Sequence, residues 1–317
     1  MSVEARKWAW ALAQLGISVR WVAGAGDGLD VAVPGLAIGA QVPPTAREVA
    51  DAVDGCDVVV VENLLSLPLN PAARDAVALA LRGRPTVVRH HDLAWQRPQF
   101  GSAAPAPPVD RAWAHVTINE LSRAELAARG VDAVTLYNRF RREEPTGAPL
   151  PPGVHGRVAL QPTRAIARKN IPAAVRLAAG IGATYWLLGP AEDGYEGELA
   201  RVLRAAPCPV VHRSAPVWDA YAAAAVVAFP STWEGFGNPT IESALARRPL
   251  AIGDYPVASE LRAFGFRWFA ADDVDAVRRF VDEPDEALLD HNEAVAQEHF
   301  SLDGLPAALQ PVLERVL

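Results

Sequence analysis

The chain has 317 residues, of which 50% are hydrophobic and 21% charged, and its formal net charge is −7. This composition is typical of a folded globular protein, and the length is better suited to two domains than to one core. The negative charge argues against nucleic acid as the main partner. No run approaches 18 apolar residues, and the N-terminus lacks a signal-peptide core, so we expect a cytoplasmic protein without a transmembrane segment. Cys56 and Cys208 are far apart in the sequence and are expected to be reduced.

The first part of the chain predicts alternating strands and helices. A helix is expected at 3–15 and a strand at 17–22. The glycines at 24, 26 and 28 are expected in a loop rather than in a dinucleotide fingerprint, because no helix follows them. Further strands are expected at 31–38, 57–61, 86–89, 116–118 and 134–137, and helices at 45–52, 70–81 and 121–129. This alternation predicts a parallel, doubly wound sheet in a first domain at 1–142.

A Pro/Gly-rich segment at 143–156 is expected to link this domain to a second one at 157–290. Strands are expected from 157 and at 183–188, 210–212, 222–229 and 249–253, and helices at 171–179, 194–204 and 217–223. Two more helices are expected at 287–300 and 305–317. The segment 291–317 is expected to return to the first domain.

The stretch from Phe229 to Gly253 carries the most informative chemistry. A buried strand leads through a polar loop and a glycine turn to Asn238, an expected N-cap, and Pro239, an expected first helical residue. Backbone N–H groups at such a helix start favour phosphate. The carboxylates of Glu234 and Glu242 can accept hydrogen bonds from sugar hydroxyls. Together these features predict a nucleotide-sugar site.

Two other interpretations of the glutamates stay open at this point. Glycosidases use carboxyl groups about 5–5.5 Å or 6.5–9.5 Å apart. Eight residues of continuous helix span about 12 Å, and the glycine turn leaves the separation undefined, so this function is disfavoured without being excluded. Alternatively, both glutamates are surface carboxylates that match the helix dipole.

The sequence Glu234-Gly235-Phe236-Gly237 followed by Glu242 resembles the Glu-x7-Glu signature of retaining GT-B glycosyltransferases, the family-four-like transferases of group 1. The resemblance implies an α/β fold of GT-B architecture, with two Rossmann-like doubly wound domains facing across a cleft. It implies metal-independent transfer of a hexose, with retention, from a nucleoside diphosphate sugar to a small-molecule, glycan or lipid acceptor. GT-B chains normally begin with a strand and a glycine-rich loop. Here the N-terminal domain is expected to lack that first strand.

The same resemblance implies roles for individual residues. Glu234 is expected to approach the donor sugar, and Glu242 to hold the ribose hydroxyls. The turn between them is expected to contact the sugar and diphosphate, through Gly235, Phe236, Gly237 and Asn238. No cofactor is expected, because the nucleotide sugar is a co-substrate.

A basic loop follows the first strand of the second domain, where a parallel sheet binds its ligands. Arg164 and Lys169 are expected to stabilise the departing diphosphate, with Arg168 as a substitute for one of them. The resemblance implies the same role, because family members keep a comparable Arg and Lys pair. The alternative is a solvated basic loop without a ligand.

A third group follows the strand at 86–89. By resemblance His91, or else His90, is expected to contact the donor sugar, and His91 is the expected catalytic residue. Asp92, Trp95 and Arg97, together with His90, are expected on the acceptor side. Asn63 is expected either there or in a turn or cap. A zinc site is disfavoured, because adjacent residues on a strand point to opposite faces and a third ligand is missing. No metal is therefore expected.

Two other functions are compatible with the same ligands. One is a non-catalytic nucleotide-sugar-binding partner subunit, motivated by the missing first strand. The other is a nucleotide-sugar epimerase of the same fold. The donor base, the sugar, the acceptor and the oligomeric state are left open by the sequence.

Overall fold

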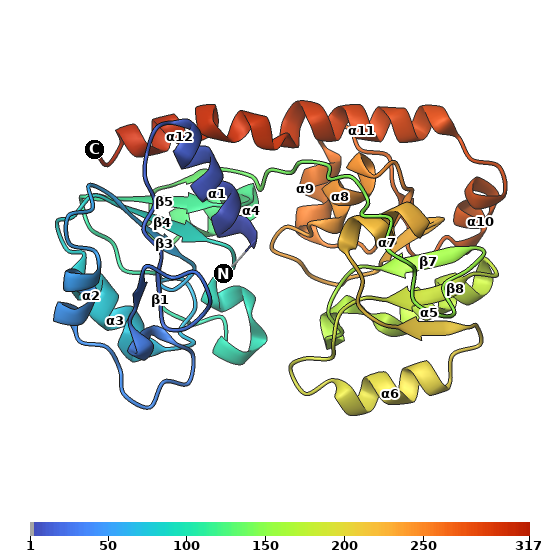
Figure 1. The fold of residues 1–317 in the computed structure, drawn as a ribbon, viewed down its shortest axis with the longest axis horizontal. Coiled ribbons are helices and arrows are strands. Elements are labelled where there is room, and N and C mark those ends of the chain that lie inside the picture. The colour runs from blue at the N-terminus through green and yellow to red at the C-terminus, as the bar shows by residue number, and fades with distance from the viewer. Residues whose placement is uncertain (1–2) are drawn as a thin grey trace. The chain divides into compact units, whose positions relative to one another are not determined.

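The computed structural model describes residues 3–317. The chain forms two compact units, one of Met1–Arg139 with Leu302–Leu317 and the other of Phe140–Ser301 (Figure 1). The segment 143–156, expected as a linker, lies inside the second unit. The boundary expected at 290 falls within a continuous helix, α11 (Glu286–Phe300), which begins where the Asp285 side chain accepts hydrogen bonds from the N–H groups of Ala287 and Leu288.

The first unit contains a parallel four-stranded sheet whose strands lie in chain order. They are β3 (Val59–Glu62), β4 (Thr86–His90), β5 (Trp113–Thr117) and β6 (Ala133–Thr135). A separate two-stranded sheet pairs β1 (Val22–Ala23) with β2 (Val31–Ala32). The strands expected at 17–22 and 31–38 are therefore mostly wrong. Ile17 and Val19 pack against a core cluster instead, and Pro34 begins a 3-10 turn, η1 (Pro34–Leu36).

Helices cover this sheet. They are α1 (Val3–Gln14), α2 (Ala46–Ala52), α3 (Pro71–Ala80), α4 (Glu120–Ala127) and α12 (Leu305–Glu314). The first described residues form a helix, as predicted. Trp8 and Leu12 of α1 share a core cluster with Leu305 and Leu309 of α12, so the last helix of the chain completes the first unit (Figure 1).

The second unit contains a parallel six-stranded sheet in the order β12-β11-β10-β7-β8-β9. The strands are β7 (Val158–Gln161), β8 (Thr184–Leu187), β9 (Val210–His212), β10 (Val226–Phe229), β11 (Leu250–Ile252) and β12 (Phe269–Ala270). The central strands are buried along their whole length, as their largely apolar sequences predict for a parallel sheet. The strand order reverses between β10 and β7.

The helices of this unit are η4 (Ala167–Lys169), α5 (Ile171–Gly180), α6 (Glu196–Arg204), α7 (Val217–Ala223), α8 (Pro239–Leu245), α9 (Pro256–Arg262), α10 (Val274–Asp282) and α11. The sequence did not predict α9, β12 or α10, because each element is short and its apolar pattern covers few residues. Within residues 3–317, no helix is both long enough and apolar enough to cross a membrane.

Candidate functional site

Charged side chains from two neighbouring loops meet where the strand order reverses in the second unit. The loop after β7 carries Arg164, Arg168 and Lys169, and the loop after the neighbouring β10 carries Glu234. A backbone hydrogen bond of 2.9 Å from the Thr232 N–H to the Arg168 carbonyl joins the two loops. Parallel sheets bind ligands at the carboxyl ends of their strands at such a reversal, so these loops are the expected ligand site.

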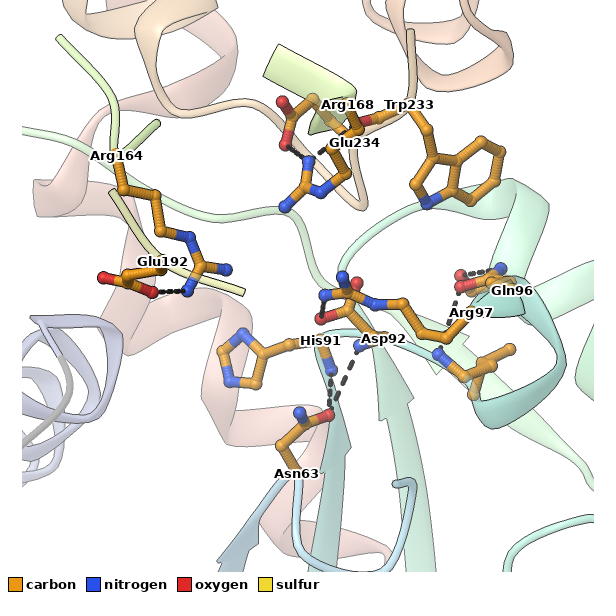
Figure 2. Close-up of polar contacts among 12 residues, drawn as sticks. Asn63, His91, Asp92, Gln96, Arg97, Arg164, Arg168, Glu192, Trp233 and Glu234 are labelled. Carbon is orange, nitrogen blue, oxygen red and sulfur yellow. Dashed lines mark hydrogen bonds and ion pairs between the residues drawn. The ribbon is translucent and has the colours of Figure 1, made fainter. Parts of the chain in front are cut away.

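Arg168, Lys169 and Glu234 form what we call the charged triplet. Lys169 Nζ donates to Glu234 Oε1 at 2.5 Å. Arg168 Nη1 donates to Glu234 Oε2 (Figure 2). Arg168 Nη1 also donates to the Trp233 carbonyl at 2.7 Å. Lys169 Nζ lies 5.2 Å from the centre of the Phe229 ring. Because Glu234 and Lys169 are both buried, these charges interact where water screens them weakly.

The triplet changes the protonation of its members. Burial lowers the pKa of Lys169 to about 8, although the charge of Glu234 partly opposes it. Burial alone would raise the pKa of the Glu234 carboxyl, but the charges of Lys169 and Arg168 outweigh it and hold this pKa below its usual value. Two cations thus face one carboxylate at neutral pH, and the excess positive charge favours an anionic ligand.

Two buried polar side chains, those of Gln161 and Tyr185, support the backbone at Lys169. Gln161 Nε2 donates to the Lys169 carbonyl at 2.9 Å, and Tyr185 Oη donates to Gln161 Oε1 at 2.6 Å. Asn170, with φ of +51°, turns the chain from η4 into α5 in the left-handed region, which asparagine tolerates better than most residues. The position of Lys169 is therefore fixed before any ligand binds.

Arg164 lies outside the triplet. Its Nη1 donates to Glu192 Oε2 at 2.6 Å, and both side chains are about 40% exposed (Figure 2). Its charge still contributes, after burial and the members of the triplet, to the low pKa of Lys169. The structure thus brings Arg168, rather than Arg164, into contact with Glu234.

The glycine turn after Glu234 offers backbone rather than side chains. Phe236 is buried and stacks on Phe140 with ring centres 5.8 Å apart, so its side chain belongs to the core. Gly237 has a φ of +89°, and a Cβ there would lie 2.7 Å from Tyr255 Oη and 2.9 Å from the Phe229 ring. Only glycine fits this position. Gly235 and Asn238 flank these residues, immediately before α8.

Glu242 lies in the first turn of α8, and its Oε2 accepts a hydrogen bond of 2.8 Å from Tyr221 Oη. Tyr221 is fully buried, and burial followed by the nearby carboxylate raises the pKa of its hydroxyl well above the usual value. A neutral Tyr221 that donates to Glu242 fixes the orientation of this carboxylate. The expected contact of Glu242 with a ribose stays a prediction.

In the first unit, His91 follows β4 and its ring is held by a neighbouring strand. His91 Nε2 lies 2.6 Å from Oε2 of Glu62, the last residue of β3. Glu62 Oε1 in turn accepts from Arg89 Nη1 at 3.0 Å. Sequence reasoning missed Glu62. The available signal was a carboxylate at the end of an apolar strand, where parallel sheets place their functional residues.

Asn63 and Arg97 hold the backbone and side chains around His91. Asn63 Oδ1 accepts from the N–H of His91 at 3.0 Å and from that of Asp92 at 3.3 Å (Figure 2). Asp92 Oδ2 accepts from Arg97 Nη2 at 2.6 Å. Asn63 is thus a support for this loop. The expected acceptor contacts of Asp92 and Arg97 stay predictions.

The structure places His90 in the core, where it cannot replace His91. His90 is 1% exposed, its Nδ1 lies 2.6 Å from Ser66 Oγ, and its Nε2 lies 2.9 Å from His115 Nδ1. Adjacent residues of a strand point to opposite faces, and here the His90 side chain is the one that points into the core. Burial, followed by the charges of His115 and His91, lowers the pKa of His90 well below its usual value.

Trp95, expected to shape an acceptor pocket, contacts α4, and its role at the acceptor stays a prediction. Its Nε1 donates to Glu125 Oε2 at 2.8 Å, and the Arg129 guanidinium lies 3.9 Å from the ring centre. Gln96 donates to the same Glu125 oxygen at 2.8 Å. Glu125 thus satisfies the indole N–H of Trp95, and the Arg129 guanidinium covers one face of its ring.

Tyr255 is a second residue that sequence reasoning missed. It follows β11 and is 3% exposed, and within the described part of the chain its hydroxyl has no hydrogen-bond partner. Burial, followed by the charge of Glu234, raises the pKa of this hydroxyl well above its usual value. Only the fold shows that the Tyr255 hydroxyl lies beside Gly237.

Across residues 3–317, no three or more His, Cys, Asp or Glu side chains lie close enough together to hold a metal ion. The buried donors of the triplet are cations, which suit an anionic ligand better than a metal.

Comparisons with known proteins agree on the fold. No protein-family model matches the chain. Mannosylglucosylglycerate synthase of Thermotoga maritima is 24% identical, in a match that covers 72% of this chain and 70% of that protein. A glycosyltransferase from Rickettsia africae superimposes with a TM-score of 0.72 at 13% identity, covering 99% of this chain and 94% of the other. HepE of Anabaena, solved with UDP-glucose, gives 0.68 at 17% identity, covering 97% and 88%. The chain has the GT-B fold, and its resemblance to GT-B glycosyltransferases is confirmed.

Proposed function

We propose that the protein is a retaining glycosyltransferase that moves a hexose from a nucleoside diphosphate sugar to an acceptor hydroxyl. The observation that carries this proposal is the charged triplet at the strand reversal of the second unit, in which Lys169 and Glu234 are buried and Arg168 is partly buried. Its two cations and one carboxylate are complementary to a ligand that joins a diphosphate to a polyol. The likeness to a mannosylglucosylglycerate synthase, to a protein named as a glycosyltransferase and to HepE, which was solved with UDP-glucose, supports the same class of donor.

In this proposal Arg168 and Lys169 bind the diphosphate and stabilise the charge that develops on it. The bond between the anomeric carbon and the β-phosphate oxygen breaks, and its electron pair stays on that oxygen. The acceptor oxygen attacks the anomeric carbon from the same face, and its proton passes to the departing phosphate. Fixed cations suit this step because they are in place before the charge appears.

Glu234 has two roles in the same step. Its carboxylate accepts hydrogen bonds from hydroxyls of the donor sugar, and it keeps both basic side chains in place before the donor binds. On binding, the diphosphate oxygens replace part of the interaction that Arg168 and Lys169 make with Glu234. This exchange of one acidic partner for another avoids a buried, unpaired charge at any stage.

A thermal-shift panel tests the proposal. UDP, GDP, ADP and TDP, each alone and with an attached hexose, are added to the full chain, and UDP-glucose is tested first because HepE was solved with it. A ligand at 100 times its dissociation constant adds about 2.7 kcal/mol to the free energy of unfolding. We expect one nucleotide family to raise the melting temperature. Release of the free nucleotide in the presence of candidate acceptors then measures transfer, and a panel without any shift would contradict the proposal.

A further inference from the structure

Glu62, the last residue of β3, contacts the ring of His91. Glu62 pairs in register with Arg89 of β4, and its two carboxylate oxygens have different partners. Oε1 accepts from Arg89 Nη1 at 3.0 Å, and Oε2 lies 2.6 Å from His91 Nε2. One carboxylate thus connects a buried cation to the imidazole that follows the next strand.

Arg89 gives this connection a rigid base. It is 1% exposed, its Nη2 donates to Asn138 Oδ1 at 2.9 Å, and its guanidinium lies 4.5 Å from the centre of the Trp8 ring. Burial alone would raise the pKa of the Glu62 carboxyl, but its hydrogen bond with His91 and the charge of Arg89 lower it below the usual value. Glu62 therefore stays ionised at neutral pH.

The hydrogen-bonding capacities of these groups fix the tautomer of His91. An ionised carboxylate only accepts, so the His91 Nε2 atom that it contacts has to carry a proton. In the neutral ring Nδ1 is then an acceptor. Asn63 also fixes the backbone on which the ring stands, through its hydrogen bond to the His91 N–H.

We propose that Glu62 is a positioning residue, which holds His91 as the Nε2–H tautomer so that Nδ1 accepts a hydrogen bond from a carbohydrate hydroxyl. This inference rests on the proposed glycosyltransferase function for the identity of the ligand. The hydroxyl belongs either to the donor sugar or to the acceptor. Glu62 itself touches neither.

The substitution Glu62→Gln tests the idea because it reverses the hydrogen-bond pattern. Arg89 can only donate, so the single amide oxygen of glutamine turns toward it. The amide NH₂ then faces His91 Nε2, which has to become an acceptor. The proton moves to Nδ1, and the ring offers a donor where the substrate hydroxyl needs an acceptor. A wrong tautomer of this kind strongly reduces catalysis in serine proteases when the aspartate of the triad becomes asparagine.

The experiment reads the tautomer directly by long-range ¹H–¹⁵N NMR of the histidine side chains, with His91→Gln to assign the signal. We expect Nε2–H in the wild type and Nδ1–H in Glu62→Gln. Glu314→Gln, an exposed glutamate of the same unit, is the matched control and keeps the wild-type tautomer. We expect kcat/KM to fall about tenfold or more in Glu62→Gln while UDP affinity stays within about twofold, since one hydrogen bond to the substrate is lost.

Two further readouts separate the possible outcomes. If the hydroxyl belongs to the donor sugar, hydrolysis of the donor without an acceptor falls together with transfer. If it belongs to the acceptor, only transfer falls. An Nδ1–H tautomer in the wild type overturns the inference even if the variant does not fold, and so does an unchanged tautomer or unchanged turnover in Glu62→Gln. Failure of the wild type to use any nucleotide sugar instead refutes the proposed function, and its NMR signal still decides whether Glu62 positions His91.

Discussion

The two larger sheets of this protein end in different ways. In the second unit the strand order reverses between β7 and β10, and three charged side chains meet from the two loops at that point. In the first unit β3 and β4 are neighbours in chain order, and the loop after β4 is held by Glu62 and Asn63 from the end of β3. A reversal directs successive connections to opposite faces of the sheet and leaves room for a ligand between them. Strands in simple order instead support one another's loops.

The largest expected effect concerns the charged triplet. We expect Glu234→Ala and Lys169→Ala to reduce kcat about 10²–10³-fold, because each removes an electrostatic contact to charge that develops during transfer. Steady-state transfer with the preferred donor measures this loss. Glu192→Ala, which removes an exposed glutamate of the same unit, is the control and should keep kcat within about twofold. Activity of Glu234→Ala within twofold of the parent would refute its role.

The core histidines of the first unit predict a loss of stability in acid. Burial lowers the pKa of His115 to about 4 from the usual 6.5, with a small opposing effect of Asp132. The unfolded chain therefore binds the proton first as the pH falls. The stabilisation is complete above pH 6.5 and is lost progressively toward pH 4, which amounts to about 3 kcal/mol. Urea unfolding between pH 7.5 and 4.5 measures it, and a free energy of unfolding that stays constant down to pH 5 would contradict it.

The charged triplet predicts that ligand binding weakens at high pH. Lys169 has a pKa of about 8, so it loses its proton and its charge as the pH rises through that value. We expect the affinity for the nucleoside diphosphate to fall about tenfold between pH 7 and 9.5, since a charge-assisted hydrogen bond is lost. Titration calorimetry across this range tests it. Lys169→Arg stays charged and should remove this pH dependence, even if its affinity is lower throughout.

The smallest effect is expected where the second unit carries an exposed ion pair. Arg164 Nη1 lies 2.6 Å from Glu192 Oε2, but both side chains are about 40% exposed, so water screens their charges. A double-mutant cycle with Arg164→Ala and Glu192→Ala should give a coupling free energy of about 1 kcal/mol or less. A larger coupling would mean that Arg164 belongs functionally with the triplet.

Much of this architecture could be predicted from the sequence. Largely apolar runs mark the buried strands β7, β8 and β10, and the glycine turn before Pro239 marks the start of α8. The prediction of a strand at 17–22 was mostly wrong. Apolar residues there pack against the core, although most of them pair with no neighbouring strand. Periodicity reports which side of a segment is buried and leaves its hydrogen-bond partners undefined.

The candidate site was predictable by residue type and much less by partner. Sequence placed Arg164, Arg168 and Lys169 in one loop, but only the fold shows that Arg164 turns to Glu192. Strand alternation indicated that His90 and His91 point apart without deciding which one is buried. Glu62 escaped notice because its partners, Arg89 and His91, are 27 and 29 residues away.

Calorimetric titration of the full chain with UDP, in the wild type and in Lys169→Met, tests the charged triplet most directly. Methionine keeps an unbranched stem like that of lysine and lacks the ammonium group, and Arg168 remains to pair with Glu234. We expect one nucleoside diphosphate, UDP or another of the panel, to bind per chain in the wild type, and the same nucleotide to bind at least about tenfold more weakly in the variant. Equal affinity of the two proteins, or wild-type protein that binds neither UDP nor any of the other nucleoside diphosphates, would contradict it.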